Sequence, residues 1–189
     1  MKSKIVAMLL LASALPATAN ELEPQMREFA ATNVAVWAEN SVLIEAIRAQ
    51  NSTTSSYSQA DIDEMDLAWR AEVGMADSTV IEPVMSNEAS AFLRGLVEEA
   101  GGVVTEIFVM DARGLNVAAS DVTSDYWQGD EAKFTETYPK GAGAIHIGDV
   151  EFDESSQAYQ GQISMTVVDP TSNQVLGAVT VGVNAESFY

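Results

Sequence analysis

The densest group of residues that could do chemistry lies between Thr123 and Glu131. Two aromatic residues, Tyr126 and Trp127, are followed closely by Asp130, and hydroxyl and carboxylate groups flank them. Tyr and Trp combine an apolar ring with a hydrogen-bonding group, and neighbouring carboxylates can orient a polar ligand. Cation–π contacts and charge pairing at such a site favour an amine. The alternative interpretation is a well-packed loop with no ligand.

Other arrangements indicate chemistry less strongly. His146 is the single histidine and lies between two isoleucines, with no G-x-S-x-G motif in the chain, which favours a packed or solvated histidine over a catalytic base. Asp149, Glu151 and Asp153 alternate at a strand end and could hold Ca²⁺, but a solvated acidic edge is favoured because EF-hand spacing is absent. With no P-loop or H-E-x-x-H motif, we expect no cofactor and no enzymatic activity.

Charge and composition narrow the class of partner. The 189 residues carry nine Lys and Arg against 28 Asp and Glu, for a net charge of −19. No basic patch is available for nucleic acid or an anionic membrane surface. Cysteine is absent, which excludes disulfides, thiolate metal sites and a cysteine nucleophile. Apolar residues make up 47%, so the chain can form one folded domain with a core.

The first 19 residues have the pattern of a secretory signal peptide. Lys2 and Lys4 precede an apolar run over 5–15, and an A-x-A sequence ends at Ala19. The run is too short to span a bilayer, which needs about 20 apolar residues. We expect cleavage after Ala19 and an exported, soluble product that begins at Asn20; the alternative is an uncleaved anchor.

A long helix is predicted over 20–50. Apolar positions recur at alternating spacings of four and three, which is a heptad seam. Asn33 and Asn40 occupy the same heptad position, where polar residues can fix the register of a dimer. The helix could therefore mediate a homodimer or dock a partner, or it could pack entirely on its own domain. The seam residues are Leu22, Met26, Phe29, Asn33, Val36, Asn40, Leu43 and Ile47.

Two shorter helices are predicted within the remaining domain, 51–189. Ser58 and Asp61 form a capping box that opens a helix through about Val73. Ser86 or Asn87 caps the next helix, which two glycines close. For Arg70, which follows Trp69, a structural salt bridge is favoured over a role in binding.

From Val103 onward the apolar period changes to two, which predicts strands. Asp111 and Gly114 have the chemistry of a turn after the first strand. Short turns pair the first strand with the second, the third with the fourth and the fourth with the fifth. The segment with Tyr126 and Trp127 is then one long connection that crosses a face of an antiparallel sheet, in an α+β domain. Gly177 and Gly182 leave room for close approach of a backbone or a ligand. The five predicted strands are 104–110, 115–120, 144–152, 159–169 and 174–184.

The sequence resembles a Cache-type extracytoplasmic sensor domain, the PAS-like module of bacterial chemoreceptors and sensor kinases. The matching residues are Asp61, Ile62, Asp66, Trp69 and Arg70; Glu106 to Asp111 with Gly114; Ser120 to Glu131; and Gly177 to Val183. The Asp-Tyr-Trp-Gln-Gly-Asp-Glu string is the most specific of these. The resemblance covers the chain from about Glu21 to its end and implies a long N-terminal helix, short helices and a five-stranded antiparallel PAS-like sheet.

The resemblance also implies a ligand pocket between the sheet and the connection that crosses it. Six candidate ligand residues are carried over from the matched string, and Asp169 is added because it ends the fourth strand and could accept from a ligand ammonium. The candidates are Ser120, Thr123, Asp125, Tyr126, Trp127, Asp130 and Asp169. An amine or amino acid is favoured. A carboxylate would need one of the bases Arg70, Arg113 and Lys133, and the arginine-bearing amino-acid motif of two-module Cache receptors is not evident.

These expectations describe a stand-alone, single-Cache periplasmic protein that binds a small molecule and reports its ligand state to a membrane kinase or chemoreceptor, in signal transduction or chemotaxis. A membrane receptor of this type would continue into a transmembrane helix and a signalling module, which we do not expect here. Two rival interpretations remain. One is a structural or interaction module with a filled pocket, and the other is a hydrolase centred on His146.

Overall fold

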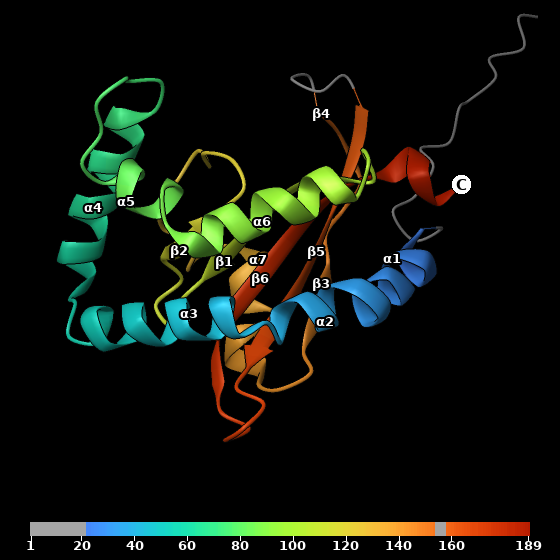
Figure 1. The fold of residues 1–189 in the computed structure, drawn as a ribbon, viewed down its shortest axis with the longest axis horizontal. Helices are drawn as coiled ribbons and strands as arrows, with labels where there is room; N and C mark the ends of the chain where they lie inside the picture. The colour runs from blue at the N-terminus through green and yellow to red at the C-terminus, as the bar shows by residue number, and fades with distance from the viewer. Residues whose placement is uncertain (1–21, 154–157) are drawn as a thin grey trace, which may run out of the picture.

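The structure is a computed structural model that describes residues 22–153 and 158–189. The predicted signal peptide and its cleavage site lie outside the described residues. Within the described ranges, no helix combines the length and apolar character needed to cross a bilayer. The chain builds helices first and then an antiparallel sheet, as the fold class predicted (Figure 1).

The N-terminal helical segment is interrupted rather than continuous. It consists of α1 (Glu23–Phe29), a π-helical stretch η2 (Ala30–Val34), α2 (Ala35–Ala38) and α3 (Ser41–Thr54). Asn40 has an extended backbone, and its side chain accepts a hydrogen bond of 2.9 Å from the Val42 amide. Asn40 is therefore the N-cap of a new helix and not the seam residue that the heptad pattern predicted.

The π-helical stretch changes which residues face the core. An i→i+5 turn inserts an extra residue, so the inward positions of this segment recur every four residues instead of every 3.6. The buried inward residues are Leu22, Met26, Ala30, Val34 and Ala38. The predicted seam is buried within this chain at both ends, whereas in the middle Val36 is 64% exposed and Asn33 is half-buried.

Three further helices precede the first strand, and one short helix follows the second. In α4 (Gln59–Glu72) the predicted capping box of Ser58 and Asp61 is present. A short helix, α5 (Ile81–Met85), fills the connection to α6 (Glu88–Glu99), for which Asn87 is the cap. The glycines at 101 and 102 have positive φ and end this helix, as predicted. Between the second and third strands lie α7 (Ala132–Thr135) and a 3₁₀ turn, η3 (Tyr138–Lys140).

The sheet has six strands because the predicted third strand is divided. Residues 145–147 and 151–153 form two short strands, and both pair with the same long neighbour. The order across the sheet is β2-β1-β6-β5-β3, with β4 also on β5. The strands are β1 (Val104–Met110), β2 (Asn116–Ala119), β3 (Ile145–Ile147), β4 (Glu151–Asp153), β5 (Ala158–Val168) and β6 (Val175–Asn184). A 3₁₀ turn, η4 (Ala185–Phe188), follows.

The first and last strands form the centre of the sheet. All three predicted strand pairings are present, and β1 additionally pairs antiparallel with β6, a long-range contact that local turns do not specify. Gly177 allows this contact, because a Cβ at that position would collide with the carbonyl oxygen of Met110. The prediction that Gly177 leaves room for close approach is thus confirmed, and the approaching group is backbone.

Helices cover one face of this sheet more fully than the other. The segment from α1 to α3 and helix α6 lie across the face shown toward the viewer in Figure 1, and α4 and α5 extend to one side. The main core lies between these helices and residues such as Val109, Val181 and Ile163. On the opposite face, α7 and η3 bury a smaller cluster around Phe108, and the hydroxyls of Ser164 and Thr180 are bonded to each other at 3.0 Å.

Candidate functional site

The Tyr–Trp segment lies beside the edge strand β2 and adds to it. Leu115 and Trp127 form an antiparallel bridge, and the Gln128 amide donates to the Gly114 carbonyl at 2.8 Å. Gly114 has φ +78°, and a Cβ there would lie 2.6 Å from the Cα of Gly129. This close backbone contact therefore requires Gly114, whereas a Cβ on Gly129 would lie 2.3 Å from the Trp127 indole nitrogen.

Helix α4 holds this segment in place from the other side. Asp66 accepts from the amides of Tyr126 and Trp127 at 2.9 and 3.0 Å, and its second oxygen accepts from Arg70. The indole N–H of Trp69 donates to the Thr123 carbonyl at 2.8 Å, and its ring stacks on that of Tyr126. These α4 residues lie three and four positions apart, on one face of the helix.

Several predicted ligand residues are occupied by internal contacts. Trp127 donates its indole N–H to the Arg113 carbonyl at 2.8 Å, and its ring lies against Gly129. Asp125 pairs with Arg70 at 3.1 Å. Arg70 thus has the structural role that the sequence predicted, with Asp66 and Asp125 as partners. None of these side chains is among those that line a cavity.

The remaining hydroxyl and acidic candidates are held by local hydrogen bonds or lie exposed at the surface. Thr123 accepts from Asn116 at 2.8 Å and donates to the Asp125 carbonyl. Ser120 accepts from the Ile107 amide at 2.9 Å, and Asp130 is an exposed surface residue. These residues shape the connection between β2 and β3, which fits the packed-loop alternative for this part of the motif.

Asp169 lies at the turn between β5 and β6. Its side chain accepts from the Thr171 amide and the Ser172 hydroxyl at 2.8 and 2.6 Å and pairs with Arg48 of α3. The bond from Ser172, then that from Thr171 and then Arg48 hold its pKa well below the ordinary range. The acceptor role that we assigned to Asp169 is therefore filled by the protein itself.

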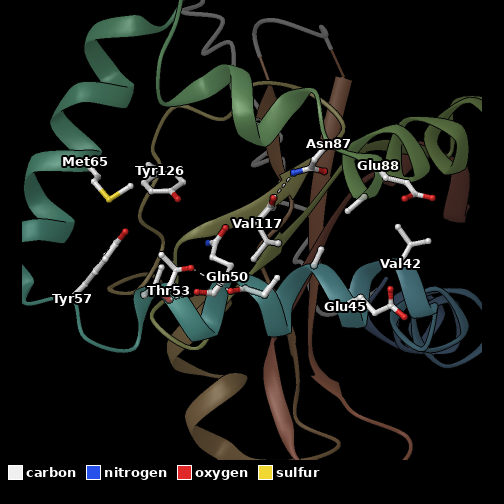
Figure 2. Close-up of a pocket in the computed structure, with 14 residues that line it drawn as sticks. Val42, Glu45, Gln50, Thr53, Tyr57, Met65, Asn87, Glu88, Val117 and Tyr126 are labelled. Carbon is white, nitrogen blue, oxygen red and sulfur yellow. Dashed lines mark hydrogen bonds between the residues drawn. The ribbon is translucent and has the colours of Figure 1, made fainter.

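Tyr126 differs from the other six candidates because it lines a groove of about 610 Å³. The groove lies between α3, the start of α6, the strand β2 and the Tyr–Trp segment (Figure 2). We call it the Tyr126 groove. Its principal lining residues are Glu45, Gln50, Thr53, Thr54, Tyr57, Met65, Glu88, Val117 and Tyr126.

The hydroxyl of Tyr126 has no hydrogen-bond partner among the described residues, although the residue is only 5% exposed. Burial and then the negative charge of Asp111 raise its pKa. The hydroxyl therefore stays protonated at neutral pH and is available as a donor. Figure 2 shows it on the side of the ring that faces Gln50. The hydroxyl is open to the groove; among the described residues, the fully buried side-chain polar atom without a partner is Asn116 Oδ1.

A buried carboxylate lies behind the floor of the groove. Asp111 is fully buried at the end of β1 and accepts four hydrogen bonds. Two come from the amides of Arg113 and Leu115, which confirms the predicted turn with Asp111 and Gly114. The other two come from Thr54 and Gln50 of α3, at 2.7 and 3.1 Å. Asp111 thus joins the first hairpin to the helix that lines the groove.

Most groove residues were missed by the sequence analysis. Gln50, Thr53, Thr54 and Tyr57 follow each other at helical spacing, but the Ser/Thr-rich stretch suggested that the helix had ended near Gln50. The helix in fact runs to Thr54. The spacing of Gln50, Thr53 and Thr54 would have been the available signal, since these three share one face of α3.

A second cavity, of about 710 Å³, lies between the sheet and residues 131–133. We call it the sheet-face cavity; it is where the resemblance implied a pocket. It includes His146, half-buried in β3, together with Lys133, which pairs with Glu131 at 2.9 Å. Asp149 also lies at its edge. Among the residues whose side chains are described, no three His, Asp or Glu are arranged to hold a metal ion.

Comparison with known proteins gives distant structural similarities only. No family model and no curated protein sequence matches the chain. Among solved structures, it is similar to the sensor domain of the V. cholerae histidine kinase DctB, at 15% identity and a TM-score of 0.45 over 90% of this chain and 57% of that one. It is also similar to the ligand-binding domain of the Campylobacter jejuni chemoreceptor Tlp3 in complex with L-valine, at 11% identity and a TM-score of 0.42 over 93% of this chain and 66% of that one.

A third similar structure is an extracellular ligand binding receptor from Desulfohalobium retbaense, at 17% identity and a TM-score of 0.39 over 78% of this chain and 25% of that one. The chain therefore spans less than two thirds of the length of each of these proteins. All three are described as sensor or ligand-binding proteins.

Proposed function

We propose that this chain is a periplasmic sensor protein that holds a small organic molecule in the Tyr126 groove and reports its occupancy to a membrane histidine kinase or chemoreceptor. The observation that carries the proposal is Tyr126: the residue is 5% exposed, and its hydroxyl has no partner among the described residues and faces a groove of about 610 Å³. Ligand sites are typically about 300–1,000 Å³, with apolar walls and a few convergent polar groups. Val117, Met65 and Tyr57 supply such walls.

Helix α3 is the element that would transmit ligand occupancy from the groove to a partner protein. Gln50 and Thr54 line the groove and also bond to the buried Asp111, so a ligand that contacts them acts on the attachment of α3 to the sheet. The part of the N-terminal helical segment from α1 to α2 precedes α3 directly and would dock the partner or a second subunit. We infer that α3 has two positions relative to the sheet. A ligand shifts the equilibrium between these positions by the difference in its affinity for them.

The proposal is tested by a thermal-shift screen of the protein from Asn20 onward against a broad metabolite library. A ligand at a hundredfold its Kd adds about 2.7 kcal/mol to the free energy of unfolding. Tyr126→Phe should weaken a groove ligand by about 1 kcal/mol, the usual contribution of one hydrogen bond. The same variant should leave the melting temperature of the free protein almost unchanged, because the hydroxyl has no partner to lose among the described residues.

Tyr138→Phe is the matched control for this screen. Tyr138 stacks on Phe134 on the opposite face of the sheet, so its variant should bind like the wild type. The proposal is contradicted if no compound stabilises the wild type, or if Tyr126→Phe and the wild type bind every hit equally.

A structural or interaction module is the second candidate, and one observation favours it. On the face of the sheet under η3, Phe108, Met110 and Phe134 form a packed cluster, and Trp127 is bonded internally. Trp127→Ala alone does not separate the two candidates, because Trp127 does not line the groove. Tyr126→Phe separates them, since a module without a ligand predicts no compound sensitive to that change.

A further inference from the structure

The two ends of the Tyr126 groove differ in chemistry. At one end, Tyr57, Met65 and Tyr126 bring two aromatic rings and a thioether together (Figure 2). At the other end, Glu45 of α3 and Glu88 of α6 extend from the two helices that border the groove. An occupant that spans the groove would meet an apolar, aromatic surface and then two carboxylates.

No basic side chain balances these carboxylates. Nine Lys and Arg are present in the chain, and seven of them lie in the described ranges, but none lines the groove. Five of the seven are committed to ion pairs elsewhere, including Arg48 with Asp169 and Arg70 with Asp66. Among the described residues, neither Glu45 nor Glu88 has an ion pair or a side-chain hydrogen bond.

The groups nearest the floor add to the negative potential. Asp111 accepts all four of its hydrogen bonds and donates none, which suits a charged carboxylate. Gln50 uses its amide nitrogen on Asp111 and on the carbonyls of Leu115 and Asn116, which leaves its Oε1 as an acceptor. The groove therefore offers acceptors and negative charge to a ligand, and the tyrosine hydroxyls are its principal donors.

We propose that the ligand is an organic amine without a carboxylate, with its ammonium between Glu45 and Glu88 and its apolar or aromatic body against Tyr57, Met65 and Tyr126. This inference rests on the function proposed above and narrows the class of ligand. An ammonium gains charge-assisted bonds from the two glutamates and cation–π attraction from the rings. A free carboxylate in the same groove meets like charges and finds no Lys or Arg, so amino acids and organic acids are disfavoured.

Three compounds that differ in one group test the ligand class by isothermal titration calorimetry at pH 7 in phosphate buffer. 2-Phenylethylamine carries the amine alone, L-phenylalanine adds a carboxylate to it, and 3-phenylpropionate carries the carboxylate alone. We expect 2-phenylethylamine to bind at least tenfold more tightly than L-phenylalanine and 3-phenylpropionate not to bind. Phosphate is used because Tris is itself an amine.

Glu45→Gln and Glu99→Gln locate the binding site of the amine. Both remove one negative charge from an exposed glutamate, but Glu99 lies at the far end of α6, outside the groove. Glu45→Gln should weaken the amine about tenfold, which corresponds to about 1.4 kcal/mol, and Glu99→Gln should leave its affinity within about twofold. Raising NaCl from 0.05 to 0.5 M should also weaken the amine, because salt screens charge pairs.

The outcomes separate this inference from the proposed function. If L-phenylalanine or 3-phenylpropionate binds as tightly as the amine, and Tyr126→Phe weakens that binding, the amine class is wrong and the groove remains a ligand site. The same conclusion follows if none of the three binds while the metabolite screen yields a Tyr126-dependent hit that is not an amine. Equal loss of affinity in Glu45→Gln and Glu99→Gln also overturns the inference. If neither the three compounds nor the screen gives a Tyr126-dependent ligand, both proposals fail.

Discussion

Tyr126 and Trp127 are neighbours in the chain but have different surroundings. The segment that carries them runs beside β2, so successive side chains point to opposite sides. Tyr126 stacks on Trp69 and faces the groove, whereas Trp127 is fixed by the Arg113 carbonyl. A motif that looks like one binding unit in the sequence therefore divides into one candidate ligand contact and one structural contact.

Glu72 gives a residue-level prediction about pH. Its carboxylate accepts from the Thr79 hydroxyl and from the amides of Thr79, Val80 and Ile81, and these bonds, with the Thr79 hydroxyl first, lower its pKa to about 2 from the ordinary 4.5. A lowered folded-state pKa stabilises the protein above pH 4.5, and this contribution is lost as the pH falls through about 2. Glu72→Gln should therefore lower the free energy of unfolding at pH 7 by more than at pH 3.

Urea unfolding of the wild type and Glu72→Gln at both pH values measures this difference. Glu64→Gln is the control, because Glu64 is exposed on the same helix and has no hydrogen bond among the described residues. If Glu72→Gln destabilises the protein as much at pH 3 as at pH 7, the four hydrogen bonds do not stabilise the charged form of Glu72 specifically.

At the scale of elements, the N-terminal segment shows how two equivalent seam positions become different. Asn33 lies within the π-helical stretch, where its side chain bonds to Thr32 at 2.8 Å, whereas Asn40 ends one helix and caps the next. The heptad pattern cannot reveal this, because a π turn and a helix break both shift the register without changing the residue types.

Asn40→Ala and Asn33→Ala should therefore have unequal effects. Loss of the cap at Asn40 should lower the free energy of unfolding by about 1 kcal/mol. Asn33→Ala should change it by less than about 0.5 kcal/mol, because a half-buried helical Asn gains helix propensity as Ala. Urea unfolding monitored by circular dichroism compares the two, and equal losses would contradict the assignment of Asn40 as a cap.

For the whole molecule, charge is the dominant surface property. A net charge of −19 destabilises the compact state through self-repulsion, and surface pairs such as Arg27 with Glu23 offset little of it. Raising NaCl from 0.05 to 0.5 M should therefore raise the melting temperature, by about 2–4 °C for each kcal/mol of repulsion removed. A scanning-calorimetry series in phosphate buffer measures the change. A melting temperature that falls with salt would mean that ion pairs outweigh the repulsion.

The sequence alone determined the class of fold, the capping box at Ser58, the turn at Asp111 and Gly114, and the local strand pairs. Each depends on residues close together in the chain, where spacing and turn chemistry suffice. Only the tertiary structure decided the pairing of β1 with β6, which gives Gly177 its role, and the assembly of the groove. The groove joins α3, β2 and α6, and its Glu45 and Glu88 are separated by two other helices. Contacts between such distant segments follow from packing of the whole chain, and no local pattern encodes them.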